Sequence, residues 1–301
     1  MTSFADRLAE RVAARSSQIV LGLDPDPTKL WPSALAAAPA EGDPAERAAT
    51  AVAAHCTALI DAAGEACVAV KPQLACFERL GALGWAALES VTRHAHEAGL
   101  LVIADGKRGD IDVTARAYGQ AQFGPVDTPF GELPGLQADA ITANPLMGRD
   151  TLEPLLAAAR AAAGGVFVLV RTSNPGAADI EDVRMSDGAP LWERLAAMVA
   201  DEGLIGEHGL ADVGAVCGAT HPEHLERLRD LMPRAPFLLP GVGAQGGRVE
   251  DLLPAFAPGP AGGLIAASRS IAAAHEQVGG EPADAARAAA ESLRAAAWAL
   301  V

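Results

Sequence analysis

The chain has very few lysines and few aromatic side chains. Only three of its 301 residues are lysine, against twenty arginines, and one Tyr, seven Phe and four Trp supply all the aromatic surface. Half of the residues are nonetheless hydrophobic, so a sizeable core must rest on Ala, Val, Leu and Ile. Because arginine fills the ordinary cationic positions, a lysine in this chain is a candidate for a role in which the two side chains differ chemically.

Net positive charge, paired cysteines and long apolar runs are also missing. The formal net charge of −15 argues against nucleic acid or an anionic membrane surface as the main partner. The four cysteines form no C-x-x-C pair, which indicates buried thiols in a reducing compartment. The start, SFADRLAERVAARSS, is a charged amphipathic helix, and no apolar run reaches the roughly 18 residues of a membrane helix. We therefore expect a cytoplasmic protein.

What the chain does have is an alternation of short apolar runs with Ala-rich helical segments. The strand candidates are residues 18–24, 67–71, 100–105, 139–144, 165–170, 212–218, 236–241 and 263–268. The helix candidates are residues 44–62, 83–98, 111–121, 150–163, 190–203, 221–232, 248–256 and 281–300. Continuous apolar strands that alternate with helices are typical of a parallel sheet buried on both faces. Eight such units predict an α/β fold, a single (β/α)₈ TIM barrel over residues 1–301 with an extra N-terminal helix over 1–17.

The alternative is an open doubly wound sheet, but no G-x-G-x-x-G follows the first strand. Two segments interrupt the alternation. Residues 122–137, rich in Pro and Gly, precede the fourth strand and should lie at the bottom or along the side of the barrel. Residues 172–190 follow the fifth strand and should cross the top face as a lid loop.

Polar side chains gather at the carboxyl ends of the predicted strands, where barrel enzymes carry their chemistry. These side chains are Asp24, Lys71, Asp105, Lys107, Thr142, Asn144, Ser173, Asn174, Ser268 and Arg269. Two of the three lysines are among them, and lysine can release and regain a proton whereas arginine cannot. One such lysine alone would more simply pair with an inner carboxylate. Two lysines together with three carboxylates favour a proton-handling site.

The heptapeptide ADGKRGD at 104–110 sharpens this interpretation. Side chains alternate along a strand, so Asp105 and Lys107 should point to the same, inward side. Asp110 lies beyond the strand and is free either to fold back or to reach a neighbouring subunit. An ammonium flanked by carboxylates stays charged, which suits a general acid better than a Schiff-base nucleophile. An ordinary surface ion-pair cluster is the alternative for D-x-K-x-x-D taken by itself.

A second group of residues indicates a phosphate site. The Gly-rich turn LLPGVGAQGG at 238–247 follows strand seven, and Arg269 follows strand eight. Backbone amides in such a turn approach a ligand closely, and phosphates bind between these two loops in many barrels. Other polar groups have simpler interpretations: the acidic pair Glu181 and Asp182 indicates an exposed loop, and four helical histidines indicate solvated positions. These histidines are His94, His96, His221 and His224.

Taken in order, four stretches of the chain resemble one known family. ADGKRGDI, VAVKPQLACFE, TSNPG and LLPGVGAQGG are together similar to orotidine 5′-phosphate decarboxylases, specifically their second bacterial group (type 2), from about residue 18 to residue 272. The resemblance implies a homodimer with shared active sites that needs neither cofactor nor metal. It also implies a reaction, the conversion of orotidine 5′-monophosphate to uridine 5′-monophosphate and CO₂ in pyrimidine biosynthesis.

The resemblance also implies roles for residues that match the family's motifs. Lys107 would protonate pyrimidine C6, and Asp105 would face the departing carboxylate. The remaining assignments place Asp110, Ile111 and Thr114 in the partner subunit's site, Asp24 and Lys71 at the ribose, Ser173 at the pyrimidine, and Gly241, Gln245 and Arg269 at the phosphate. Two alternatives stay open: a Mg²⁺-dependent sugar-phosphate decarboxylase or aldolase of the same superfamily, and a non-catalytic nucleotide-binding barrel.

Overall fold

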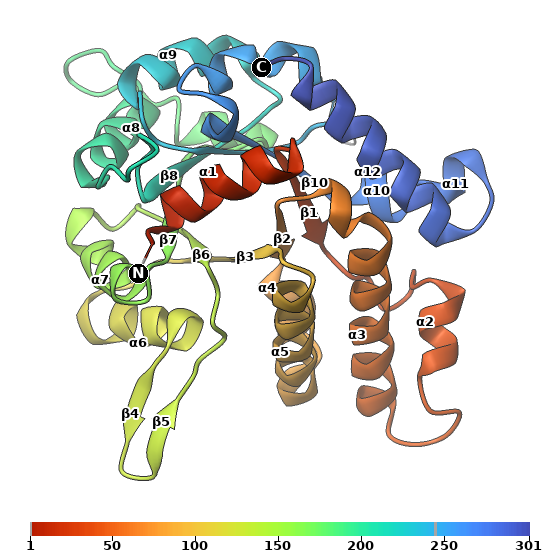
Figure 1. Cartoon of the computed structure of the whole chain (residues 1–301). Coiled ribbons are helices and arrows are strands. Elements are labelled where there is room, and N and C mark those ends of the chain that lie inside the picture. Colours follow the sequence, from red (N-terminus) through yellow and green to blue (C-terminus); the bar gives the residue numbers. More distant parts are fainter. Residues whose placement is uncertain (1, 244–245) are drawn as a thin grey trace.

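The computed structural model describes residues 2–243 and 246–301, and its centre is a closed barrel of parallel strands (Figure 1). The barrel strands are β1 (Ile19–Leu23), β2 (Ala69–Pro72), β3 (Leu101–Arg108), β6 (Ala140–Ala143), β7 (Gly165–Arg171), β8 (Val213–Cys217), β9 (Phe237–Pro240) and β10 (Gly263–Ala267). They follow one another around the barrel in chain order, and β10 pairs with β1 to close it. The predicted (β/α)₈ barrel is confirmed, with all eight strands at the expected places.

The barrel strands are buried along almost their whole length. Every residue of β1, β6 and β8 is buried. Helices cover the outer face of the barrel and side chains fill its interior, so both faces of each strand are shielded from solvent. This explains why the strands appear in the sequence as continuous apolar runs. β3 differs from the others because it continues beyond its expected end at residue 105 and becomes accessible to solvent over Gly106–Arg108.

Helices surround the barrel (Figure 1). The longer ones are α3 (Pro44–Ala63), α5 (Gly81–Glu97), α6 (Asp112–Phe123), α7 (Glu153–Ala161), α8 (Leu191–Glu202), α9 (Leu225–Leu231) and α12 (Pro282–Trp298). The helix expected over 248–256 is instead a 3₁₀-helix, η5 (Val249–Phe256), with Pro254 inside it. In an α-helix the ring of Pro254 would clash with the carbonyl four residues before it, so the segment does not form a regular α-helix.

Short helical turns complete the connections. They are α2 (Pro32–Ala37), α4 (Leu74–Glu78), α10 (Arg269–Ala272), α11 (His275–Val278), η1 (Gly64–Ala66), η2 (Arg149–Thr151), η3 (Pro175–Asp179), η4 (Pro222–His224) and η6 (Pro260–Gly262). Segments of this length span too few turns to produce a helical hydrophobic period, so the sequence does not indicate them separately.

The N-terminal helix α1 (Phe4–Arg15) covers the end of the barrel at which the strands begin. Ser3 caps it by accepting a hydrogen bond from the Asp6 amide. Phe4 and Leu8 pack in one cluster with the first residues of several strands, and the Phe4 ring meets Phe167 of β7 edge-on at 5.9 Å. The amino-terminal end of the barrel is therefore closed by apolar packing, and the opposite end is left for function.

The segment 122–137 forms a small antiparallel hairpin of β4 (Val126–Thr128) and β5 (Gly131–Leu133). Figure 1 shows the hairpin projecting from the body of the barrel next to α6. Phe130 at its tip is 99% exposed. Among the described residues, no helix has both the length and the apolar character needed to cross a lipid bilayer.

Candidate active site

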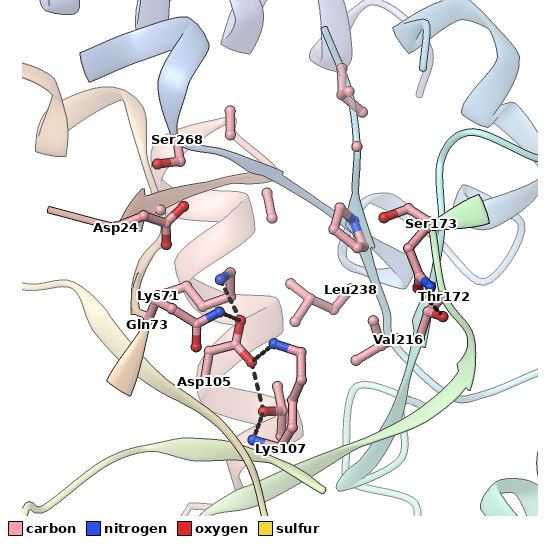
Figure 2. Close-up of a pocket in the computed structure, with 18 of the residues that line it drawn as sticks. Asp24, Lys71, Gln73, Asp105, Lys107, Thr172, Ser173, Val216, Leu238 and Ser268 are labelled. Carbon is pink, nitrogen blue, oxygen red and sulfur yellow. Dashed lines mark hydrogen bonds and ion pairs between the residues drawn. The ribbon is translucent and has the colours of Figure 1, made fainter. Parts of the chain in front are cut away.

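The carboxyl ends of the barrel strands surround a cavity of about 490 Å³. Each of the eight strands, or the loop after it, contributes to the lining (Figure 2). Figure 2 shows the charged side chains Asp24, Lys71, Asp105 and Lys107 on one side of the cavity and Ser173 on the other. Apolar residues of β7–β10 form the floor between them: Leu169, Val216, Leu238 and Ala266. The cavity thus has a polar wall of fixed charges beside an apolar surface.

Asp105 is the centre of the polar wall. Its Oδ2 accepts a hydrogen bond from Lys71 Nζ at 2.6 Å, and its Oδ1 accepts one from Lys107 Nζ at 2.7 Å. Thr142 donates its hydroxyl to the same Oδ1 at 2.8 Å, and the Gln73 amide approaches Oδ2 at 3.5 Å. Side-chain exposure is 7% for Asp105 and 10% for Lys71 but 44% for Lys107. Lys107 is therefore the ammonium that faces the open cavity.

The glycines of ADGKRGD allow this arrangement. Lys107 has φ +47°, in the left-handed region that side chains other than Gly seldom occupy, and β3 shifts register against β6 between Ala104 and Arg108. The Lys107 amide is held there by a 2.9 Å hydrogen bond to Thr142 Oγ1. A Cβ on Gly109 would stand 2.6 Å from the Asn144 carbonyl oxygen. The turn therefore requires glycine at 109 and keeps Asp105 and Lys107 on the same side despite the bulge.

The ion pairs fix the charge states of the buried groups. Burial by itself would raise the pKa of Asp105, but Lys71 and Lys107 outweigh it and lower that pKa to about 2. Burial would likewise lower the pKa of Lys71, but Asp105 and Asp24 outweigh it and raise that pKa above its usual value. Near neutral pH the wall thus carries an ionised carboxylate between two ammonium groups, one on each oxygen.

The structure bears on Asp110, which the sequence left open between folding back and reaching a neighbouring subunit. Asp110 Oδ1 accepts a hydrogen bond from the Ile111 amide, and within the described part of the chain no ion pair joins Asp110 to Lys107. Asp110, Ile111 and Thr114 do not line the cavity, and Ile111 is 59% exposed. Asp110 is therefore not folded back onto Lys107 in this structure, and its contact with a neighbouring subunit stays a prediction.

The opposite end of the cavity is formed by the loops after β9 and β10. Gly241 (φ +102°) and Gly243 (φ +72°) make the tight turn, which is closed by the 3.0 Å bond from the Gly247 amide to the Gly241 carbonyl. Arg269 lines the cavity at the start of α10 and forms no ion pair within residues 2–243 and 246–301. Gln245 lies outside the described residues. A free guanidinium beside a Gly-rich turn can hold an anionic group.

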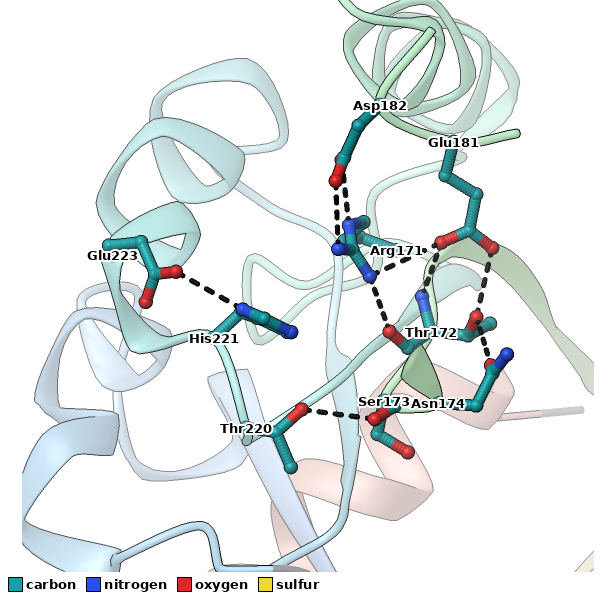
Figure 3. Close-up of polar contacts among 9 residues, drawn as sticks. All are labelled: Arg171, Thr172, Ser173, Asn174, Glu181, Asp182, Thr220, His221 and Glu223. Atoms are coloured by element: carbon teal, nitrogen blue, oxygen red, sulfur yellow. Dashed lines mark hydrogen bonds and ion pairs between the residues drawn. The ribbon is translucent and has the colours of Figure 1, made fainter. Parts of the chain in front are cut away.

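The loop after β7 is anchored by a buried arginine that the sequence analysis left without a role. Arg171 is 3% exposed and forms a bidentate pair with Asp182, with Nε–Oδ1 at 2.9 Å and Nη2–Oδ2 at 3.0 Å (Figure 3). Glu181 accepts hydrogen bonds from the Thr172 amide at 2.8 Å and hydroxyl at 3.0 Å. Glu181 and Asp182 do lie in a loop, but both are half-buried and pair with Arg171. They hold the segment that carries Ser173 to the cavity rim.

Several residues of the site were missed by sequence reasoning or placed only loosely. Gln73 follows β2 by one residue and reaches Asp105, and Glu181 lines the cavity from within the lid segment. Gln73 could have been found, since it stands two residues after Lys71 and so shares its side of the strand. Glu181 could not, because the eight residues between it and Thr172 contain only the short 3₁₀-helix η3 and give no strand or helix period to follow.

Known proteins that are similar to this chain belong to the family that the sequence motifs resemble. Residues 17–288 match the model of the "Orotidine 5′-phosphate decarboxylase / HUMPS family". The chain is 39% identical over 282 residues to orotidine 5′-phosphate decarboxylase of Rhodopirellula baltica, covering 92% of this chain and 90% of that protein. The corresponding enzyme of Haloarcula marismortui is 42% identical over 274 residues, or 91% and 88% of the two chains.

A solved structure agrees in both fold and sequence. The OMP decarboxylase of Leishmania donovani superimposes with a TM-score of 0.73 at 35% identity, over 98% of this chain and 99% of that one. The match therefore covers almost the whole of both chains. The chain belongs to the orotidine 5′-phosphate decarboxylase / HUMPS family.

Proposed function

We propose that this protein converts orotidine 5′-monophosphate to uridine 5′-monophosphate and CO₂, the decarboxylation that completes pyrimidine nucleotide synthesis. The observation that carries the proposal is the Lys71–Asp105–Lys107 array, in which a partly exposed ammonium is held against a buried, ionised carboxylate. Relatives of about 40% identity over nine-tenths of the chain carry the decarboxylase name. The substrate's charge and shape fit the two ends of the cavity.

The substrate is an anionic nucleotide, and the cavity offers a partner for each of its parts. Its phosphate would bind at the Gly241 turn and Arg269, with Gln245 as the further donor expected from the family. Its ribose hydroxyls would meet Asp24 and Lys71, and Ser173 would contact the pyrimidine edge above the apolar floor. A planar base gains from an apolar surface while its polar edges are satisfied at the rim.

The reaction would proceed at the free side of the Lys107 ammonium. The bond from C6 to the carboxylate carbon breaks, CO₂ leaves, and the electron pair stays on C6. Lys107 Nζ gives its proton to C6 and is reprotonated by water, which its 44% exposed side chain can reach. A fixed ammonium beside the growing negative charge stabilises the transition state more than the ground state. Asp105, held ionised, would face the departing carboxylate and favour its loss by repulsion.

The same array argues against the Mg²⁺-dependent alternative. Both oxygens of Asp105 already accept short hydrogen bonds from ammonium groups, at 2.6 and 2.7 Å. A divalent cation at this carboxylate would have to displace the lysines and would be repelled by the one that remained. The residues therefore fit a metal-free reaction better than a sugar-phosphate chemistry that needs Mg²⁺.

The protein would act as a homodimer with shared active sites. Four large apolar side chains are exposed where the chain leaves the neighbouring strands β3 and β6: Ile111, Val113, Leu146 and Met147. A concentration of apolar surface at one rim indicates a protein contact. A partner that covers it would bring its own Asp110 and Thr114 near this chain's cavity, as the family pattern suggests.

The test is the loss of the orotate absorbance when purified protein meets orotidine 5′-monophosphate in EDTA. We expect rapid, complete turnover in EDTA and formation of one CO₂ per uridine 5′-monophosphate. Folded protein that turns over nothing under these conditions would contradict the proposal. Turnover of a phosphorylated sugar acid that appears only with Mg²⁺ would support the alternative enzyme, and tight nucleotide binding without turnover would support a silent barrel.

A further inference from the structure

A cluster of metal-binding side chains lies outside the active-site cavity, on the loop after β8. The ligand atoms of His221, Glu223 and His224 all lie within 4.8 Å of one another. The sequence analysis interprets the two histidines as solvated, but in the structure both are half-buried. His221 Nδ1 lies 3.1 Å from Glu223 Oε1 (Figure 3).

The local backbone explains why these side chains converge. Pro222–His224 is the 3₁₀-helix η4, and His221 precedes it as the N-cap, with the His224 amide donating a 3.1 Å hydrogen bond to the His221 carbonyl. The rings of His221 and His224 stack, with centroids 5.8 Å apart and planes 29° from parallel. Trp192 of α8 also contacts the His224 ring, with centroids 5.2 Å apart and planes tilted by 43°. The sequence H-P-E-H therefore presents two imidazoles and a carboxylate from a single hydrogen-bonded turn.

We propose that His221, Glu223 and His224 form a binding site for a transition-metal ion of the zinc class. Two imidazole nitrogens and one carboxylate oxygen are a ligand set that Zn²⁺ takes with water in the fourth position, whereas Mg²⁺ and Ca²⁺ prefer oxygen ligands alone. Tetrahedral Zn²⁺ needs ligand atoms about 3.4 Å apart. The ligand atoms now lie within 4.8 Å of one another, so a bound ion would draw the side chains closer; the exposed Glu223 already approaches His221 Nδ1 at 3.1 Å.

The ion would lie behind the wall of the active site rather than in it. Ser173 and Asn174 line both the active-site cavity and the hollow that contains His221 and His224. Thr220, next to His221, donates its hydroxyl to the Ser173 carbonyl at 3.2 Å (Figure 3). The site is thus separate from the Lys71–Asp105–Lys107 array, and the proposal does not depend on the decarboxylase function.

The test is a calorimetric titration of Zn²⁺ into the untagged, full-length protein after EDTA treatment and removal of the chelator. We expect one ion per chain and a rise in melting temperature on binding. Glu223→Gln keeps the size of the side chain and both histidines, and His224→Ala removes a ligand. Each should weaken Zn²⁺ binding by at least about tenfold.

A matched control is His208→Ala. His208 faces Glu10 at 3.7 Å but belongs to no group of three ligands among the described residues. The His208→Ala protein should bind Zn²⁺ with the same affinity as the parent protein. Equal Zn²⁺ affinity in the parent, Glu223→Gln and His224→Ala proteins, all folded by circular dichroism, would overturn the proposal, as would the absence of binding below millimolar Zn²⁺. Decarboxylation measured in EDTA reports on the proposed function alone, so the two proposals can fail separately.

Discussion

At the scale of single residues, the site depends on the different surroundings of its two lysines. Lys71 is almost fully buried, and Asp105 and Asp24 hold it charged. Lys107 shares the same carboxylate but leaves almost half of its side chain in the cavity. One ammonium thus fixes the carboxylate, and the other can exchange a proton with substrate and water. Arginine could serve in the first role but not in the second.

This difference predicts the behaviour of Lys107 variants. Lys107→Ala should reduce turnover by at least about 10⁴-fold, while uridine 5′-monophosphate still binds measurably. Lys107→Arg keeps the positive charge but cannot release the proton, so it should be nearly as inactive. The measurements are steady-state decarboxylation and product binding by calorimetry. Lys29→Ala, at the third and exposed lysine, is the control. An active Lys107→Arg enzyme would show that charge alone suffices and would refute the proton-donor role.

The low pKa of Asp105 predicts a pH-dependent contribution to stability. The folded-state pKa of about 2 lies below the ordinary value of 3.8, so the ionised form is favoured by folding. The contribution is fully present above about pH 4, is worth about 2 kcal/mol, and is lost as the pH falls towards 2. Urea unfolding of the parent and Asp105→Asn proteins between pH 7 and 2.5 measures it. We expect the stability advantage of the parent to be constant near neutrality and to shrink below pH 4; a gap independent of pH would contradict this.

At the scale of elements, the lid segment is held at its base. Arg171 is the last residue of β7, and its bidentate pair with Asp182 closes the loop at a distance of eleven residues along the chain. Its Nη1 also donates to the Thr172 carbonyl at 2.7 Å. The base of the loop is therefore fixed to the barrel by this ion pair. Any closure over a ligand must occur in the loop residues that the ion pair does not hold.

Replacing Arg171 should loosen this loop. Arg171→Ala leaves Asp182 and Glu181 without their cation and should lower the free energy of unfolding by about 3 kcal/mol. Arg171→Lys cannot form the bidentate pair, so it should raise KM for the nucleotide more than it lowers kcat. Chemical denaturation and steady-state kinetics measure the two effects. Arg184→Ala, at an exposed arginine of the same loop, should change neither. An unchanged KM in Arg171→Lys would show that the loop base does not position the substrate.

At the scale of the whole molecule, the two ends of the barrel have different tasks. α1 closes the amino-terminal end with Phe4, Leu8 and Val12, and the cavity lies at the opposite end, where the strands finish. The exposed apolar rim at Ile111 and Val113 lies at this open end. A second subunit placed there would protect apolar surface and enclose the substrate at the same time.

Shared sites predict complementation between two inactive variants. Lys107→Ala and Asp110→Ala should each be inactive alone. A mixed dimer has one site with both intact residues, so random subunit exchange should restore about a quarter of the parent activity. Mixing the variants under mild dissociating conditions and assaying decarboxylation measures this. If sedimentation shows that the mixture contains dimers but no decarboxylation activity returns, the result would contradict a shared site. Mixing either variant with itself is the control.

The sequence by itself determined the barrel and most of the site. Continuous apolar strands alternating with helices leave few arrangements in which all strands are buried on both faces, so the order of the eight strands followed from the pattern. The positions of Asp24, Lys71, Asp105 and Lys107 followed as well, because in a parallel barrel every strand's carboxyl end is at the same face.

Only the tertiary structure decided how these groups pair. The left-handed conformation of Lys107 and the bulge in β3 depend on contacts with Thr142 and Asn144, which are more than thirty residues away along the chain. The pairing of Arg171 was likewise decided by the tertiary structure. Its carboxylate partners lie in a loop whose sequence has no repeating hydrophobic pattern. Periodic patterns report on which face a side chain lies, because burial repeats with the backbone. The choice of partner is made by distance in space, and no local pattern in the sequence records it.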